Sequence, residues 1–229
     1  MSNRSFEELK RHWNAYERAL KIKSHLESAG SYWTIQMLAR YIKRRDIEFI
    51  KPQQRRKDNI TEEIDDKYNL SMKAIGGQPR SEYDTRILLD AILQTICVYK
   101  KLTIRTEQTI KCNSLPTNKY DYIMYYNNQP IGVVEAKRPG CLIDKSVAQL
   151  LVQLLLLSAQ DPVLFYFGVL SDGNQFVFAG VREEKVLFFQ TNQNKLEIAT
   201  IRSFQGLGSI VGTMLWLIHD AVTERKIFL

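Results

Sequence analysis

Acidic and basic side chains stand at one end of a predicted β-hairpin in the middle of the chain. Asp121 opens the first strand, within the segment 119–126, and Glu135 and Lys137 close the second strand after the apolar run 131–134. Two carboxylates at one edge of a sheet can hold a divalent cation, and a lysine beside them can steady an activated water. These groups are the minimum that hydrolysis of a phosphodiester requires.

A triplet of glutamate, any residue and lysine is common, so its surroundings decide its meaning. Three other triplets in this chain have the same form: Glu8-Leu9-Lys10, Glu183-Glu184-Lys185 and Glu224-Arg225-Lys226. The first and last fall in predicted helices, where residues two apart point about 200° apart, and the second falls in a predicted polar turn. Only Glu135 follows an apolar run typical of a buried strand. On that strand Glu135 and Lys137 share a face and Ala136 points away.

The predicted turn 127–130 brings the Asp121 strand alongside the Glu135 strand. Simple hairpin pairing places Asp121 closest to residues near Lys137, at the same end of the ladder. An acid or an amine at the end of a buried strand is costly unless it is paired or bound to a metal. A structural salt bridge between Asp121 and Lys137 is therefore the alternative to a metal site.

The elements around the hairpin supply further polar residues. Ser81 is a favourable N-cap, with Glu82 and Asp84 in the first helical turn that follows. After the hairpin, a strongly apolar helix is predicted with Gln149 in its first part; there the glutamine faces the site or lines the helix's polar edge. Beyond the hairpin strands, the predicted elements are a strand near 102–109, the apolar helix over about 145–159, strands at 163–170, 175–180 and 185–191, and a helix over about 208–223. This order predicts an α/β fold, a central mixed sheet flanked by helices.

The net charge of +7 is concentrated in one segment. Residues 40–57 carry eight basic side chains against two acids, and this basic segment attracts polyanions without sequence preference. We predict that nucleic acid contacts six of these side chains: Arg44, Arg45, Lys51, Arg55, Arg56 and Lys57. A solvated helix end or a nuclear-import signal would have the same composition.

Three regions are predicted along the chain. Residues 1–50 form an N-terminal helical region, with amphipathic helices over about 5–28 and 32–45. Residues 51–80 are polar, with separate basic and acidic clusters, and are predicted to be a linker or an arm. Residues 81–229 form the α/β domain. The N-terminal helices, with their two tryptophans, offer a surface for a homodimer or another protein partner.

Several classes of protein are disfavoured by composition. No apolar run reaches the roughly 18 residues that cross a bilayer, and no secretory signal follows the first residues. The three cysteines and three histidines lack metal-ligand spacing, which disfavours a zinc site. We expect an intracellular protein, cytoplasmic or nuclear, that has no membrane association.

Taken together, these motifs resemble the PD-(D/E)XK nuclease superfamily over about residues 81–190. The resemblance consists of an acidic helix beginning Ser81-Glu82-Tyr83-Asp84, Asp121 opening a hairpin, Glu135-Ala136-Lys137 closing it, and the helix with Gln149. It is most similar in character to the nuclease domains at the start of type I restriction motor subunits and of Crinkler-type effectors. Tyr120 stands where many members have proline, a position that varies in the superfamily.

The resemblance implies a restriction-endonuclease-like core and a role for each residue at the hairpin end. Asp121 and Glu135, with the carbonyl of Ala136, would hold Mg²⁺ or Mn²⁺. Lys137 would position the attacking water and stabilise charge at the phosphorus. The substrate would be DNA, because the resembling families mostly cut DNA.

Residues outside the hairpin complete the implied site. Glu82 would reach the metal directly or through water, with Asp84 as a substitute, and Gln149 would contact a phosphate or a metal-bound water. Two other functions stay open: a catalytically inactive nucleic-acid-binding module on the same fold, and an effector or interaction module that uses the N-terminal helices.

Overall fold

The computed structural model describes residues 47–50, 60–112, 115–142, 144–159, 161, 163–183, 185–189, 199–200 and 204–228. The predicted helices over 5–28 and 32–45 lie outside these residues. So do the predicted nucleic-acid contacts Arg44, Arg45, Lys51, Arg55, Arg56 and Lys57.

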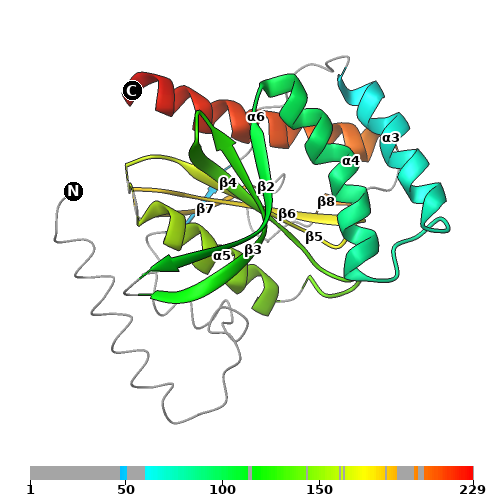
Figure 1. Ribbon diagram of the computed structural model, residues 1–229, viewed down its shortest axis with the longest axis horizontal. Coiled ribbons are helices and arrows are strands. Elements are labelled where there is room, and N and C mark those ends of the chain that lie inside the picture. The colour runs from blue at the N-terminus through cyan, green and yellow to red at the C-terminus, as the bar shows by residue number, and fades with distance from the viewer. Residues whose placement is uncertain are drawn as a thin grey trace, which may run out of the picture.

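A mixed β-sheet forms the centre of the described structure (Figure 1). Its strands run in the order β1-β7-β6-β5-β4-β3-β2, and β8 pairs with β6. The strands are β1 (Ile47–Ile50), β2 (Thr103–Cys112), β3 (Leu115–Tyr126), β4 (Gln129–Ala136), β5 (Tyr166–Ser171), β6 (Gln175–Arg182), β7 (Lys185–Phe189) and β8 (Ala199–Thr200). The pairs β4–β5 and β1–β7 are parallel, and the other pairs are antiparallel. The predicted mixed sheet is confirmed.

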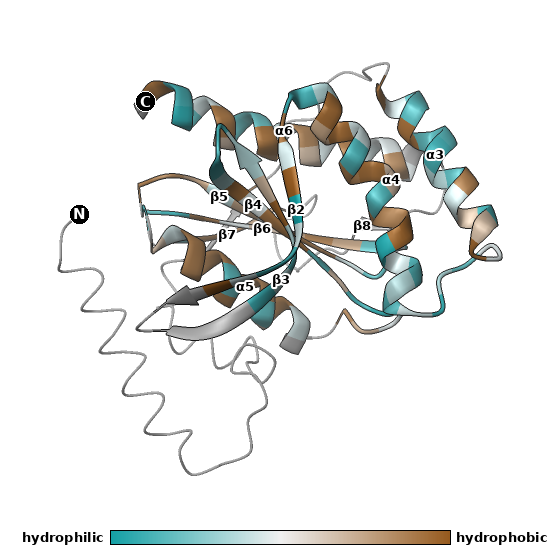
Figure 2. Cartoon of the chain, viewed as in Figure 1, coloured by the Kyte–Doolittle hydropathy of each residue, from teal (hydrophilic) through white to brown (hydrophobic). Residues whose placement is uncertain are grey.

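Helices cover both faces of this sheet. They are α3 (Ile60–Ala74), α4 (Glu82–Lys100), α5 (Asp144–Ser158) and α6 (Phe204–Phe228). Helices α3, α4 and α6 pack in one hydrophobic cluster, and α5 packs in a second cluster across the sheet. Figure 2 shows hydrophobic residues along α5 and the inner strands, and hydrophilic residues on the outer turns of α3 and α4. None of the described helices is long and apolar enough to cross a membrane.

Strand β4 contributes to both hydrophobic clusters because it lies inside the sheet. Val134 and Ala136 pack toward α4 and α6, whereas Val133 packs toward α5. Successive side chains of a strand point to opposite faces, so a strand covered on both sides reads as a continuous apolar run. This is why the segment 131–134 was recognisable as a buried strand.

Within the segment 51–80, predicted to be a linker or an arm, residues 60–74 instead form helix α3. Ile60, Ile64 and Tyr68 are buried in the same cluster as α4. Their spacing of four residues is helical, but the charged residues between them obscured the pattern. The packed unit therefore does not begin at residue 81. Residues 47–50, within the predicted helical region 1–50, form the edge strand β1 beside β7.

The hairpin turn is shorter than predicted, and the register of the two strands shifts within the hairpin. Asn127 and Asn128 alone form the turn, and both have positive φ angles, as the central residues of type I′ turns do. The register shifts by one residue between Met124 and Tyr125, so that Tyr122 pairs with Val134. The ladder ends with Asp121 and Glu135 as the next residues of the two strands, which agrees with the prediction that Asp121 lies beside residues near Lys137.

Candidate active site

Asp121 lies at the end of the β3–β4 ladder and is nearly buried, with 8% of its surface exposed. Its Oδ2 accepts the Ala136 N–H at 2.8 Å, and its Oδ1 accepts a hydrogen bond from Arg86 Nη2 at 2.5 Å. Because Ala136 lies between Glu135 and Lys137, the first bond holds the Asp121 carboxylate against the part of β4 that carries the other two predicted groups.

Glu135 and Lys137 form an ion pair on one face of β4. Lys137 Nζ donates to Glu135 Oε1 at 2.7 Å, and 16% of the lysine side chain is exposed. The predicted sharing of a face is confirmed. The alternative of an Asp121–Lys137 salt bridge is not what the described contacts show, because Asp121 pairs with Arg86 and Lys137 pairs with Glu135.

Two glutamines of α5 hold the Glu135 carboxylate from the opposite side. Gln149 Nε2 donates to Oε1 at 2.7 Å, and Gln153 Nε2 donates to Oε2 at 3.0 Å and to the Lys119 carbonyl at 3.1 Å. The two glutamines are one helical turn apart, so they share a face of α5. Neither simply lines an outer polar edge of the helix.

Arg86 joins three carboxylates beside the site. Its Nη2 contacts Asp121 and lies 3.2 Å from Glu82 Oε1, and its Nη1 lies 3.0 Å from Glu107 Oε1. Glu82 is therefore linked to Asp121 through the guanidinium rather than placed directly beside it. The predicted direct contact of Glu82 with a metal would need this arrangement to change.

Asp84 has a structural role. Its carboxylate accepts the N–H groups of Arg80 and Ser81, and the Ser81 side chain accepts the Asp84 N–H. These bonds form a capping box at the start of α4, where Ser81 is the predicted N-cap. The Asp84 carboxylate is thus engaged in capping α4 and not in the contacts described around Asp121.

The backbone where β4 ends is anchored from two neighbouring elements. Thr85 Oγ1 of α4 donates to the Lys137 carbonyl at 2.9 Å, and the Lys137 N–H donates to the Ser171 carbonyl of β5 at 2.8 Å. Lys137 is thus held in position at its backbone as well as at its amine.

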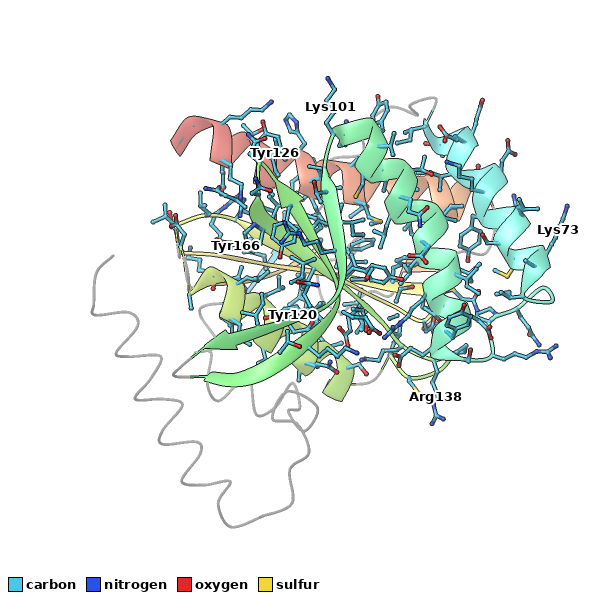
Figure 3. The ribbon with its side chains drawn as sticks, in the orientation of Figure 1. Lys73, Lys101, Tyr120, Tyr126, Arg138 and Tyr166 are labelled. Carbon is cyan, nitrogen blue, oxygen red and sulfur yellow. The ribbon has the colours of Figure 1, made fainter. Side chains whose placement is uncertain are left out.

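The loop that follows Lys137 is tied to the turn after β5. The buried Asp172 carboxylate accepts the Gly140 N–H at 3.1 Å and also accepts the N–H groups of Asn174 and Gln175. The turn predicted at 171–174 is confirmed, and its aspartate also positions the loop. In Figure 3 the exposed Arg138 projects outward from this loop, whereas Tyr120 lies among the central side chains.

The two carboxylates are close enough to repel one another. Burial raises the pKa of Asp121, and the negative charge of Glu135 raises it further, to about 6. The Ala136 N–H, Arg86 and Lys137 act in the opposite direction. A divalent cation shared by Asp121 and Glu135 would relieve this repulsion.

The donor chemistry fits a hard cation with few protein ligands. Among the described residues, no group of three or more His, Cys, Asp and Glu side chains is arranged so that it could itself hold a metal ion. Asp121, Glu135 and the carbonyl of Ala136 offer only oxygen atoms. Mg²⁺ keeps several waters and is commonly bound by one or two carboxylates together with substrate phosphates, so this set of donors suffices.

Three residues of this network were missed by sequence reasoning. Arg86 follows Glu82 by one helical turn, and Gln153 follows Gln149 by one turn, so both could have been found from helical spacing. Glu107 gives no such signal, because its approach to Arg86 depends on how β2 lies beside α4.

No protein-family model matches this chain, and no curated protein sequence matches it.

Proposed function

We propose that this chain is a metal-dependent nuclease that hydrolyses phosphodiester bonds in nucleic acid, with DNA as its substrate. The observation that carries the proposal is the convergence of Asp121, Glu135 and Lys137 where the β3–β4 ladder ends. Two carboxylates and an amine from adjacent strands meet there, and Lys137 is still partly exposed.

The succession of elements supports a restriction-endonuclease-like core of the PD-(D/E)XK type. An acidic helix (α4) precedes three antiparallel strands, the last two of which bear the aspartate and the Glu-Ala-Lys triplet. Helix α5, with Gln149, follows, and then β5 pairs in parallel with β4. This is the order of motifs on which the resemblance to that superfamily rests.

Each residue of the site has a role in this proposal. Asp121, Glu135 and the Ala136 carbonyl would hold Mg²⁺ or Mn²⁺, which when bound acts as a Lewis acid and lowers the pKa of a bound water. Lys137 orients the attacking water and stabilises negative charge at the phosphorus through its ammonium. Gln149 keeps Glu135 in place and can donate its second N–H to a phosphate oxygen.

A second candidate is a nucleic-acid-binding module without catalytic activity. It is favoured by one observation: all four oxygens of Asp121 and Glu135 already accept hydrogen bonds from protein groups. With Arg86 and Lys137 as partners, the two acids are neutralised without a metal.

Cleavage assays separate the two candidates. The chain, stripped of metal with a chelator, is incubated with supercoiled or linear DNA, or with RNA, and Mg²⁺ or Mn²⁺ is then added. We expect metal-dependent DNA cleavage, which Glu135→Ala abolishes and Lys137→Met reduces at least about 100-fold. Lys73→Met is the matched control, because Lys73 is exposed in the last turn of α3. Circular dichroism verifies that each variant folds.

The results distinguish activity from binding. Undiminished cleavage by both Glu135→Ala and Lys137→Met would refute the proposed nuclease site. Salt-dependent DNA binding by the wild-type chain, without cleavage under either metal, would support the binding module instead.

A further inference from the structure

The single positive charge of the Arg86 guanidinium has three carboxylate partners. It contacts Asp121, Glu82 and Glu107, and one quarter of the arginine side chain (26%) is exposed. Lys119 Nζ also lies 3.2 Å from Glu107 Oε2, so two positive charges stand among three negative charges and the group keeps an excess negative charge. Such a group favours an additional cation.

Asp121 has one oxygen committed to the backbone and one committed to Arg86. Oδ2 accepts the Ala136 N–H, whereas Oδ1 accepts from Arg86 Nη2. A divalent cation bound to Asp121 would share the carboxylate with this fixed positive charge. Like charges repel strongly in a partly buried setting, so the two cations disfavour one another there.

Arg86 can release Asp121 without losing every partner. Glu107 holds Nη1 at 3.0 Å, and Glu82 lies on the preceding turn of the same helix. Glu107 has a φ of 52°, which is uncommon for a residue other than glycine and is enriched at functional sites. The β2–β3 ladder pairs its neighbours Thr106 and Gln108 but not Glu107 itself.

We propose that Arg86 is a built-in competitor of the metal for Asp121. It neutralises Asp121 in the metal-free protein and is retained by Glu107 and Glu82 when a divalent cation binds. The inference rests on the metal site of the proposed function and adds a means of regulating it: whatever strengthens or weakens the hold of Glu107 on Arg86 changes the affinity for metal.

Titration calorimetry with Mn²⁺ on the metal-stripped full chain tests this competition. Arg86→Gln removes the competing charge and is expected to tighten Mn²⁺ binding by about tenfold, within the range typical of coupled binding events. Glu107→Gln removes the alternative partner and is expected to weaken binding. In the Arg86→Gln background, Glu107→Gln should have no further effect, because the residue through which it acts is gone.

Arg105→Gln is the matched control for the loss of one positive charge. Arg105 is an exposed residue of the same strand as Glu107, and its guanidinium lies over the Tyr125 ring. This variant should bind Mn²⁺ with wild-type affinity. If Arg86 only supported the shape of the site, Arg86→Gln would weaken binding, so the sign of the change separates the two roles.

Unchanged or weaker Mn²⁺ binding by folded Arg86→Gln overturns the inference, as does the absence of Mn²⁺ binding by all variants. If Arg86→Gln does not fold, Glu107→Gln decides: weaker binding supports competition, and unchanged or tighter binding overturns it. If the wild-type chain cleaves DNA but Arg86→Gln binds Mn²⁺ with unaltered affinity, only the competition is refuted. If Arg86→Gln is the only variant that binds Mn²⁺, and the wild-type chain does not cleave DNA, the competition is upheld and the proposed activity is refuted.

Discussion

Glu135 owes its place in the interior to the groups that satisfy its oxygens. Only 4% of the residue is exposed, and Lys137, Gln149 and Gln153 all donate to its carboxylate. A buried carboxylate without such partners would be expensive in free energy. The donors come from the residue that follows β4 and from α5, so the position of this carboxylate depends on how the helix packs on the sheet.

Gln153 should contribute to stability more than Gln149 does. Gln153→Leu fills a similar volume but leaves both Glu135 Oε2 and the Lys119 carbonyl without this donor, in the interior. We expect a loss of about 1–3 kcal/mol in the free energy of unfolding. Gln149→Leu should cost less, because Gln149 is partly exposed and water can replace it. Urea denaturation of the two variants measures the difference, and equal losses would contradict this ranking.

The charge on Asp121 should destabilise the metal-free fold at neutral pH. Its folded-state pKa is raised from 3.8 to about 6, so the protonated form is favoured by folding. The associated stability is present below the ordinary pKa and is lost as the pH rises through about 6. Asp121→Asn cannot ionise. With a chelator present, we expect this variant to have a higher melting temperature than wild type at neutral pH. Each kcal/mol gained in the free energy of unfolding raises the melting temperature by about 2–4 °C. The advantage should disappear near pH 4, where Asp121 is protonated in the wild-type chain.

Thermal unfolding at the two pH values measures this effect. Added Mn²⁺ should raise the melting temperature of the wild-type chain and leave that of Asp121→Asn nearly unchanged, because the variant lacks a ligand. Should Asp121→Asn melt below wild type at neutral pH without metal, the ion pair with Arg86 would outweigh the cost of burying the charge.

At the scale of elements, β4 is the piece on which the candidate active site is assembled. It pairs with β3 on one side and β5 on the other, and its buried residues contact helices on both faces. Gly132 shows how closely β4 and β5 fit together, because a Cβ there would lie 2.6 Å from ring atoms of Phe167. A strand so constrained can present Glu135 and Lys137 in one fixed orientation.

Arg225 connects the terminal helix to this sheet from inside the protein. Only 1% of it is exposed, and it donates to the carbonyls of Phe165, Ala221 and Pro130. Burial lowers the pKa of its guanidinium. The carbonyl groups come from α6, from the first residues of β4 and from the residue before β5, so one side chain joins three elements.

Replacing Arg225 should loosen that connection. Arg225→Met leaves the carbonyls without their donor and is expected to cost about 2–4 kcal/mol of the free energy of unfolding. Arg182→Met is the control: Arg182 is about one-third exposed and forms ion pairs with Asp220 and Glu224, so it should cost about 1 kcal/mol or less. Denaturant titration compares the two, and a similar cost for both would contradict the role assigned to Arg225.

At the scale of the whole molecule, the basic segment and the candidate active-site residues come from different parts of the sequence. The acids and the lysine lie where the β3–β4 ladder ends, whereas the only described residues of the basic segment 40–57 are 47–50, which form β1 beside β7. Nucleic acid would have to meet both in order for the basic segment to help cleavage.

Neutralising the basic segment should weaken DNA binding mainly at low salt. We expect the variant with Arg44, Arg45, Arg55 and Arg56 all replaced by Gln to show a flatter dependence of log affinity on log salt concentration, by about one unit for each phosphate that the protein no longer neutralises. A control variant with four exposed or partly exposed lysines replaced by Gln (Lys73, Lys100, Lys101 and Lys226) should keep the wild-type slope. Fluorescence anisotropy at several salt concentrations measures both slopes, and an unchanged slope in the first variant would reject the predicted role of these arginines.

What the sequence determined by itself was local. The capping box at Ser81, the apolar run before Glu135 and the helical pattern of α5 could be recognised because caps, strand alternation and helical periodicity depend on residues a few positions apart. The pairing of Glu135 with Lys137 followed from the same rule, since residues two apart share a face of a strand.

Only the tertiary structure decided which distant groups meet. The reach of Arg86 to Asp121 and the approach of Gln153 to Glu135 join residues 35 and 18 positions apart, and no local pattern specifies them or the register shift in the hairpin. Helix α3 was missed for the same reason: its weak apolar stripe becomes meaningful only when α4 and α6 cover it. Such contacts are chosen by the burial of the whole core, which is a property of the folded chain and not of any one segment.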